Sequence, residues 1–157
     1  MADAIEANLS QGDTFWDIGA NIGLYSLFAS KIVGSDGGVV SFEPAPWVFT
    51  LLRSNTRGDD SIQIFQYGIG NADGSALFAA HGYSMAASFI EEVTELTAQG
   101  ARQALSQLPR ARWEINRIYD PTVPIRKVCV TTRKIDTLLS ELQAPSLIKI
   151  DVEGFEL

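Results

Sequence analysis

Two residue types that small proteins often use as cross-links are almost missing from this chain of 157 residues. There is one cysteine, Cys129, which excludes a framework of disulfides within the chain. There is one histidine, His81, so no cluster of His and Cys can hold zinc. We therefore expect no metal site, and any metal ion would have to be held by oxygen ligands.

Long hydrophobic runs are missing as well. No stretch of the sequence approaches the roughly 20 apolar residues of a membrane-spanning helix, and the residues from Met1 to Glu6 are acidic where a signal peptide would be basic. A composition of 46% hydrophobic and 20% charged residues is typical of a globular protein with a core. We expect a single domain over residues 1–157, without a membrane segment and located in the cytoplasm.

Positive charge is also scarce, because the formal net charge is −7. This balance disfavours binding to nucleic acid backbones or to anionic membranes. Eight of the twelve basic residues nevertheless lie between residues 101 and 134, where only two acids accompany them. Such a segment fits either a solvated helix face rich in arginine or a surface that receives an anionic substrate.

Apolar patterns predict strands that alternate with helices, which is typical of a mostly parallel sheet. We therefore expect a doubly wound, Rossmann-like α/β fold with helices on both faces. A helical, basic insertion is predicted at about residues 91–124. Strands are predicted at residues 15–18, 39–43, 62–67, 75–80, 128–130 and 147–151, and helices at 22–33, 47–55, 93–108, 110–119 and 135–142.

A glycine turn, Asp17-Ile18-Gly19-Ala20-Asn21-Ile22-Gly23, joins the first predicted strand to the first predicted helix. Glycine permits a sharp turn and a close ligand, and free amides at the helix start are expected to face that ligand. A dinucleotide fingerprint would require glycine where the chain has Asn21 and Leu24. A dehydrogenase of the NAD type is therefore the weaker alternative.

Two acids refine this prediction. Glu43 ends the second predicted strand at the distance from the turn where a carboxylate accepts hydrogen bonds from a ribose. Asp17 ends the first predicted strand, where it would repel phosphate and attract a cation. Both carboxylates could instead cap the helices that follow them. Taken together, they favour S-adenosylmethionine, which joins an adenosine to a sulfonium and an ammonium group.

Four segments carry a resemblance to a known family. The sequence resembles the FkbM-type methyltransferases, a branch of the class I enzymes that use S-adenosylmethionine, from about residue 10 to the last residue. The matching segments are residues 17–26 (DIGANIGLYS), 41–46 (SFEPAP), 134–139 (KIDTLL) and 148–156 (IKIDVEGFE).

The resemblance implies a role for each matching position. Asp17, Gly19, Asn21 and Gly23 would surround the methionine portion of the cofactor, and Glu43 would hold the ribose hydroxyls. In addition, Gly70 and Asn71, at the end of the third predicted strand, would lie near adenine. Members of the family methylate hydroxyl groups, often on sugars or secondary metabolites, which implies a small-molecule acceptor.

A hydroxyl acceptor must lose a proton, which requires a base or a metal ion. Asp151 and Glu153 follow the fourth core strand and are the candidate catalytic residues, although Asp151 could instead cap a helix or shape the pocket. His81 is a second candidate base, but a lone histidine beside a predicted strand is more often a surface residue.

Class I methyltransferases normally have seven core strands, and this chain ends after the fourth. It would therefore be either a fragment of a longer protein or a shortened form that needs a partner. The open sheet edge favours pairing with a second copy. An inactive module for nucleotide binding or dimerisation remains an alternative to the enzyme.

Overall fold

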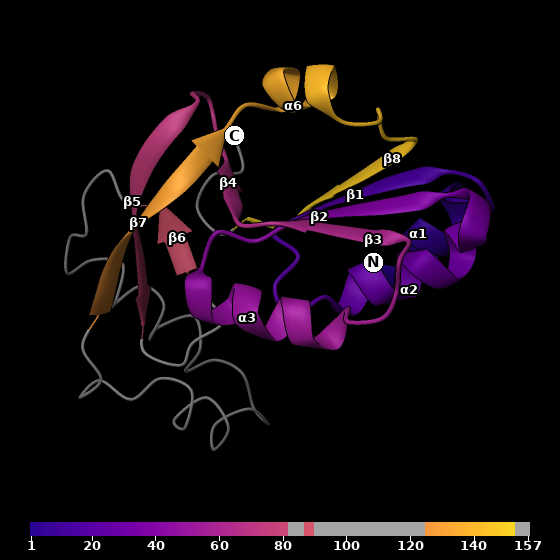
Figure 1. The fold of residues 1–157 in the computed structure, drawn as a ribbon, viewed down its shortest axis with the longest axis horizontal. Coiled ribbons are helices and arrows are strands. Elements are labelled where there is room, and N and C mark those ends of the chain that lie inside the picture. Colours follow the sequence, from indigo (N-terminus) through magenta and orange to yellow (C-terminus); the bar gives the residue numbers. More distant parts are fainter. Residues whose placement is uncertain (82–86, 90–124, 153–157) are drawn as a thin grey trace.

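The core of the molecule is a parallel β-sheet. A computed structural model describes residues 1–81, 87–89 and 125–152 (Figure 1). Within them, four strands form this sheet in the order β3-β2-β1-β8, and every neighbouring pair is parallel. Their bounds are β1 (Thr14–Ile18), β2 (Gly38–Phe42), β3 (Ile62–Phe65) and β8 (Leu147–Ile150).

Helices cover both faces of this sheet, as the doubly wound prediction requires. On one face, helices pack against Phe15 and Val39, and on the other face Leu138 packs against Trp16 and Val40. In Figure 1, α6 lies above the sheet while α2 and α3 lie below it. The bounds are α1 (Ala2–Asn8), α2 (Leu24–Val33), the short 3-10 helix η1 (Gly34–Asp36), α3 (Pro46–Asn55) and α6 (Ile135–Glu141).

Local sequence signals explain where the helices begin and end. Pro46 starts α3, a position where its missing N–H costs nothing. At the end of α2, Gly34 adopts a φ of 66° and its N–H donates to the carbonyl of Ser30. These two helices and α6 confirm the helices predicted over the same stretches, whereas the sequence analysis did not predict α1.

A second sheet stands beside the first and is mixed rather than parallel. Its order is β4-β7-β5-β6, with β4 parallel to β7 and with β5 antiparallel to both β7 and β6. Side chains alternate between its faces, so Phe78 and Val130 are buried while Leu77 and Cys129 are exposed. The bounds are β4 (Tyr67–Ile69), β5 (Gly74–His81), β6 (Ala87–Phe89) and β7 (Ile125–Arg133).

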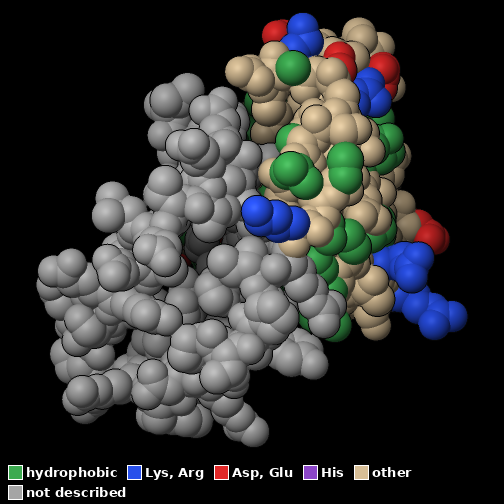
Figure 2. Space-filling view, turned by 90° about the vertical axis from the view of Figure 1, so that its left-hand side faces the viewer, with side chains coloured by type: hydrophobic (Ala, Val, Ile, Leu, Met, Phe, Trp, Pro, Cys, Tyr) green, Lys and Arg blue, Asp and Glu red, His purple; other side chains and the backbone are tan. Residues whose placement is uncertain are grey.

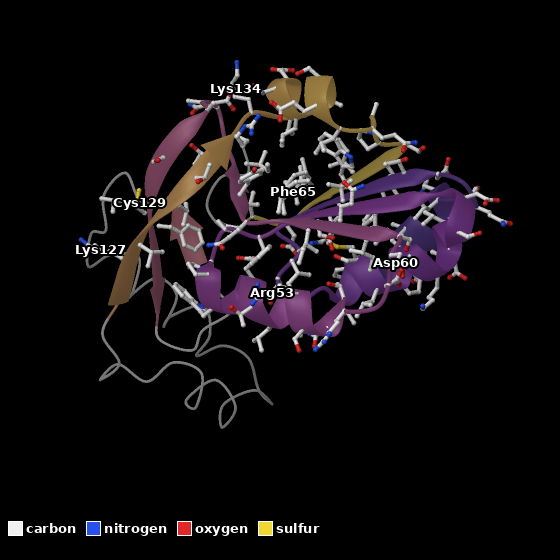
Figure 3. The ribbon with its side chains drawn as sticks, in the orientation of Figure 1. Arg53, Asp60, Phe65, Lys127, Cys129 and Lys134 are labelled. Atoms are coloured by element: carbon white, nitrogen blue, oxygen red, sulfur yellow. The ribbon has the colours of Figure 1, made fainter. Side chains whose placement is uncertain are left out.

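The outer face of the second sheet is visible in Figures 2 and 3. Hydrophobic and basic side chains are scattered over the described part of this surface (Figure 2). Lys127 and Cys129 of β7 both point outward, away from the parallel sheet (Figure 3). Lys127 belongs to the basic segment between residues 101 and 134, and it is exposed to solvent.

One predicted strand, residues 62–67, is wrong as a single element. The structure divides it at Gln66 into β3, which pairs with β2, and β4, which pairs with β7. Stacked rings span the division, because Phe65 stacks on Phe42 at 5.8 Å and on Tyr67 at 5.5 Å between ring centroids. Figure 3 shows Phe65 between the parallel sheet and α6.

Other predictions fall outside the described residues. They are the helices at 93–108 and 110–119 and, with them, the basic insertion at about 91–124. In the described part of the chain, no helix has the length and apolar character needed to cross a membrane.

Candidate functional site

The glycine turn lies at the carboxyl edge of the parallel sheet, between β1 and α2. Three of its residues have positive φ angles, namely Gly19 at 73°, Asn21 at 53° and Gly23 at 91°. Asparagine is one of the few residues besides glycine that adopts this conformation readily. The turn therefore depends on these residue types before any ligand is considered.

Close packing adds a second requirement for glycine. A Cβ on Gly19 would lie 2.1 Å from the carbonyl oxygen of Asp151, and a Cβ on Gly23 would lie 2.7 Å from Cδ1 of Leu52. The N–H of Asp151 also donates to the carbonyl of Ile18 at 3.0 Å. The end of β8 is therefore pressed against the turn, and the two glycines make both contacts possible.

The amides within the turn are engaged by hydrogen bonds inside the protein. The N–H groups of Gly19 and Ala20 both donate to the carbonyl of Phe42, and that of Gly23 donates to Ala20. The N–H of Ile22 donates to the side-chain oxygen of Asn21. The N–H groups of these four residues are therefore not available to a ligand, and free amides at the start of α2 stay a prediction.

Glu43 links the turn to the end of β2. One carboxylate oxygen accepts the N–H of Asn21 at 3.0 Å, and the other accepts the N–H of Ala45 at 2.9 Å. Each oxygen keeps a second lone pair that can accept a further hydrogen bond. Burial raises the pKa of Glu43 above 4.5, although these two hydrogen bonds act in the opposite direction.

Asp17 lies beneath the turn and is fully buried, with 0% of its surface exposed. Lys149 donates to one of its oxygens at 2.8 Å, and Ser26 donates to the other at 2.7 Å. Ser41 in turn donates to Ser26 at 2.8 Å. Asp17 is thus held inside the protein by Lys149 and Ser26, and its contact with a cofactor stays a prediction.

Lys149 is the residue that the sequence analysis missed. Its side chain is 5% exposed, and besides Asp17 it donates to the carbonyl of Gly19 at 3.0 Å. Its ammonium also lies 5.3 Å from the centre of the Tyr25 ring, a cation–π distance. A lysine in the apolar strand Leu147–Ile150 was a usable signal, because a buried charge is almost always paired.

The remaining candidate residues lie in three different places. Asp151 directly follows β8 and its side chain is 53% exposed at the same edge as the turn. Gly70 and Asn71 follow β4 in the second sheet, not the third core strand, which corrects their predicted position. Glu153 lies outside the described residues, as does the side chain of His81 at the end of β5.

Two further features of the described residues bear on the site. No group of three or more His, Cys, Asp or Glu side chains in this part of the chain is arranged to hold a metal ion. A hollow lined by Ser30, Lys31 and Asp59 lies at the opposite, amino edge of the parallel sheet, away from the turn.

Comparisons with known proteins identify methyltransferases as similar proteins. Residues 17–157 match the methyltransferase FkbM domain family. The hexuronic acid methyltransferase AglP of Haloferax volcanii is 24% identical over 150 residues, which cover 94% of this chain and 48% of that protein. The chain therefore spans about half the length of this curated relative.

Two solved structures are similar over smaller parts. A methyltransferase of Aquifex aeolicus that depends on S-adenosylmethionine is 22% identical, with a TM-score of 0.39 and coverage of 41% of this chain and 37% of that one. Fibrillarin of Aeropyrum pernix, solved with bound S-adenosyl-L-methionine, is 24% identical, with a TM-score of 0.38 and coverage of 39% and 26%.

Proposed function

The chain belongs to the methyltransferase FkbM domain family, and we propose that it binds S-adenosylmethionine and serves the transfer of a methyl group to a hydroxyl of a sugar. The observation that carries this proposal is the junction of Glu43 with the glycine turn. A buried carboxylate there joins two strand ends of a parallel sheet and retains lone pairs for a ligand. The crevice beyond the carboxyl ends of such a sheet is where ligands bind.

The residues at this edge fit the cofactor. Glu43 would accept hydrogen bonds from the two ribose hydroxyls, while its contacts with Asn21 and Ala45 fix its orientation. Gly19 and Gly23 give the turn its positive φ angles and let the end of β8 and Leu52 pack against it, which fixes the edge that the cofactor would meet. Adenine would lie nearer to Gly70 and Asn71, which follow β4. When bound, the cofactor supplies a methyl group activated by its sulfonium.

The chain's own residues would orient the acceptor and take its proton. The methyl group would pass to the acceptor oxygen, which would lose its proton to the protein. Asp151 is the proposed base for the hydroxyl proton, because its exposed carboxylate lies beside the turn. Glu153 is proposed as a second catalytic residue on the basis of the sequence alone.

A sugar acceptor is supported by the curated relative, whose name specifies a hexuronic acid. Such an acceptor is anionic, which suits the basic residues between 101 and 134. Arg133 contributes little to this attraction, since its guanidinium already pairs with Asp73 and Glu141. Lys127 is exposed on β7 but points away from the parallel sheet (Figure 3), so this attraction would rest on the other basic residues of the segment.

Calorimetry with S-adenosylhomocysteine tests the cofactor. We expect wild-type protein to bind it, and Glu43→Ala to weaken binding at least about tenfold, the typical cost of losing charge-assisted hydrogen bonds. Glu6→Ala is the matched control, because Glu6 is exposed on α1. Equal affinity in Glu43→Ala and Glu6→Ala would count against the proposal.

Transfer of a labelled methyl group tests the reaction. Glucuronic acid and glucose are compared as acceptors, and we expect faster transfer to the anionic sugar and a loss of transfer in Asp151→Asn. Cofactor binding without transfer to any hydroxyl compound would favour an inactive binding module. A rise in NADH fluorescence on titration with protein would favour a dehydrogenase instead.

A further inference from the structure

We propose that Lys149 is a positioning residue that sets the charge of the cofactor site, which deepens the function proposed above and rests on it. Three carboxylates gather around the carboxyl ends of β1, β2 and β8, namely those of Asp17, Glu43 and Asp151. Among the described residues, the ammonium of Lys149 is the cation placed between them, at 2.8 Å from Asp17 and 3.8 Å from Asp151. Its role is to neutralise Asp17.

Burial makes this pairing decisive. The side chain of Asp17 is 0% exposed and that of Lys149 is 5% exposed, so bulk water screens neither charge well. Asp17 has its second oxygen occupied by Ser26, and Lys149 is held a second time by the carbonyl of Gly19. The pair is therefore a fixed part of the turn rather than a mobile surface contact.

Lys149 and Asp17 also act electrostatically on Glu43. Lys149 lowers the pKa of Glu43 and Asp17 raises it, although burial is the largest influence on that group. A single ammonium cannot neutralise three carboxylates, so the site keeps a net negative charge. A site of this kind favours a cationic ligand over a neutral ligand of the same shape.

The cofactor and its product have nearly the same shape but differ in charge. S-adenosylmethionine carries one positive charge more than S-adenosylhomocysteine, because the sulfonium becomes a neutral thioether once the methyl group leaves. The ratio of their affinities therefore measures the local charge while shape is nearly constant. A purely structural role of Lys149 would change both affinities together and leave the ratio unchanged.

The experiment measures both dissociation constants by calorimetry for wild type, Lys149→Met, Lys149→Arg, Asp17→Asn and the double variant Asp17→Asn with Lys149→Met. Removing a unit charge from a partly screened site should change the ratio about tenfold. We expect the preference for S-adenosylmethionine to rise in Lys149→Met and to fall in Asp17→Asn. It should stay at the wild-type value in Lys149→Arg and return to it in the double variant.

The matched control is Lys31→Met, which removes an ion pair with Asp59 at 3.6 Å whose lysine is 78% exposed at the other edge of the sheet. Its ratio should equal that of wild type. Should Lys149→Met not fold, the comparison of Asp17→Asn with the double variant decides the matter. If the affinity ratio stays within twofold of wild type in every variant that binds, the inference about Lys149 is refuted and the proposed function is not. If wild type binds neither compound, both the inference and the proposed function are refuted.

Discussion

Replacing Gly19 with alanine is expected to destabilise the protein by about 2 to 5 kcal/mol. Two separate costs contribute to this value. The φ of 73° places an alanine in the left-handed region, which costs about 1 to 2 kcal/mol. The new Cβ would lie 2.1 Å from the carbonyl oxygen of Asp151, and relief of such overpacking costs a further ~1 to 3 kcal/mol.

A second glycine separates these costs. Gly12 has a φ of 85°, but a Cβ there would meet nothing within 4 Å. Gly12→Ala therefore carries the conformational cost without the clash and should lose only about 1 kcal/mol. Gly23→Ala should fall between the two, since its Cβ would meet the flexible end of the Leu52 side chain at 2.7 Å.

Urea unfolding of the three variants and wild type measures this order. We expect the midpoint to fall in the order Gly12→Ala, Gly23→Ala, Gly19→Ala with a constant slope, so that stability alone has changed. In Gly19→Ala, the displaced end of β8 should also weaken binding of S-adenosylhomocysteine. Equal losses in Gly12→Ala and Gly19→Ala would refute the idea that the approach of Asp151 restricts this position.

Three further predictions concern ionisable groups. Either Asp17→Asn or Lys149→Met should cost about 3 kcal/mol by leaving a buried charge unpaired, and the double variant should cost less than the sum of the two in a denaturation cycle. Burial raises the pKa of Glu43 above 4.5, so its protonated form stabilises the fold below pH 4.5, and this contribution is lost as the pH rises through the raised pKa. In unfolding experiments from about pH 4 to about pH 7, wild type should therefore lose stability relative to Glu43→Gln. Parallel stability curves for the two proteins would contradict this. The hydroxyl of Thr137 and the N–H of Lys134 lower the pKa of Asp73 below 3.8. Asp73→Asn should therefore have a lower melting temperature than wild type above pH 3.8, and the two melting temperatures should converge as the pH falls through the lowered pKa of Asp73.

The last of these predictions reflects how the second sheet is attached to the first. α6 begins at Ile135 without a side-chain cap of its own. Asp73, in the turn before β5, accepts the N–H of Lys134 at 2.8 Å and the hydroxyl of Thr137 at 2.7 Å. A distant carboxylate therefore serves as the cap that the local sequence lacks. Periodicity within residues 134–139 could not reveal it.

Much of the fold was predictable because its signals are local. The family prediction and the α/β fold are confirmed, and β1, β2 and β8 lie within one residue of the predicted strands. These strands are short apolar runs bounded by turns, and Gly34 marks the end of α2 while Pro46 marks the start of α3. The glycines of the turn were also identified correctly, because a positive φ restricts the residue type at the position itself.

The sequence by itself determined the order of β1, α2, β2, α3, α6 and β8, the glycine turn and the presence of acids at the strand ends, since each depends on a few neighbouring residues. Tertiary structure alone decided which way those acids face and what they meet. Asp17 and Lys149 are 132 residues apart in the chain and become partners only when β8 pairs with β1. In the same way, the division of residues 62–67 at Gln66 follows from pairing with β7, because a strand's sheet is fixed by its neighbours rather than by its own pattern.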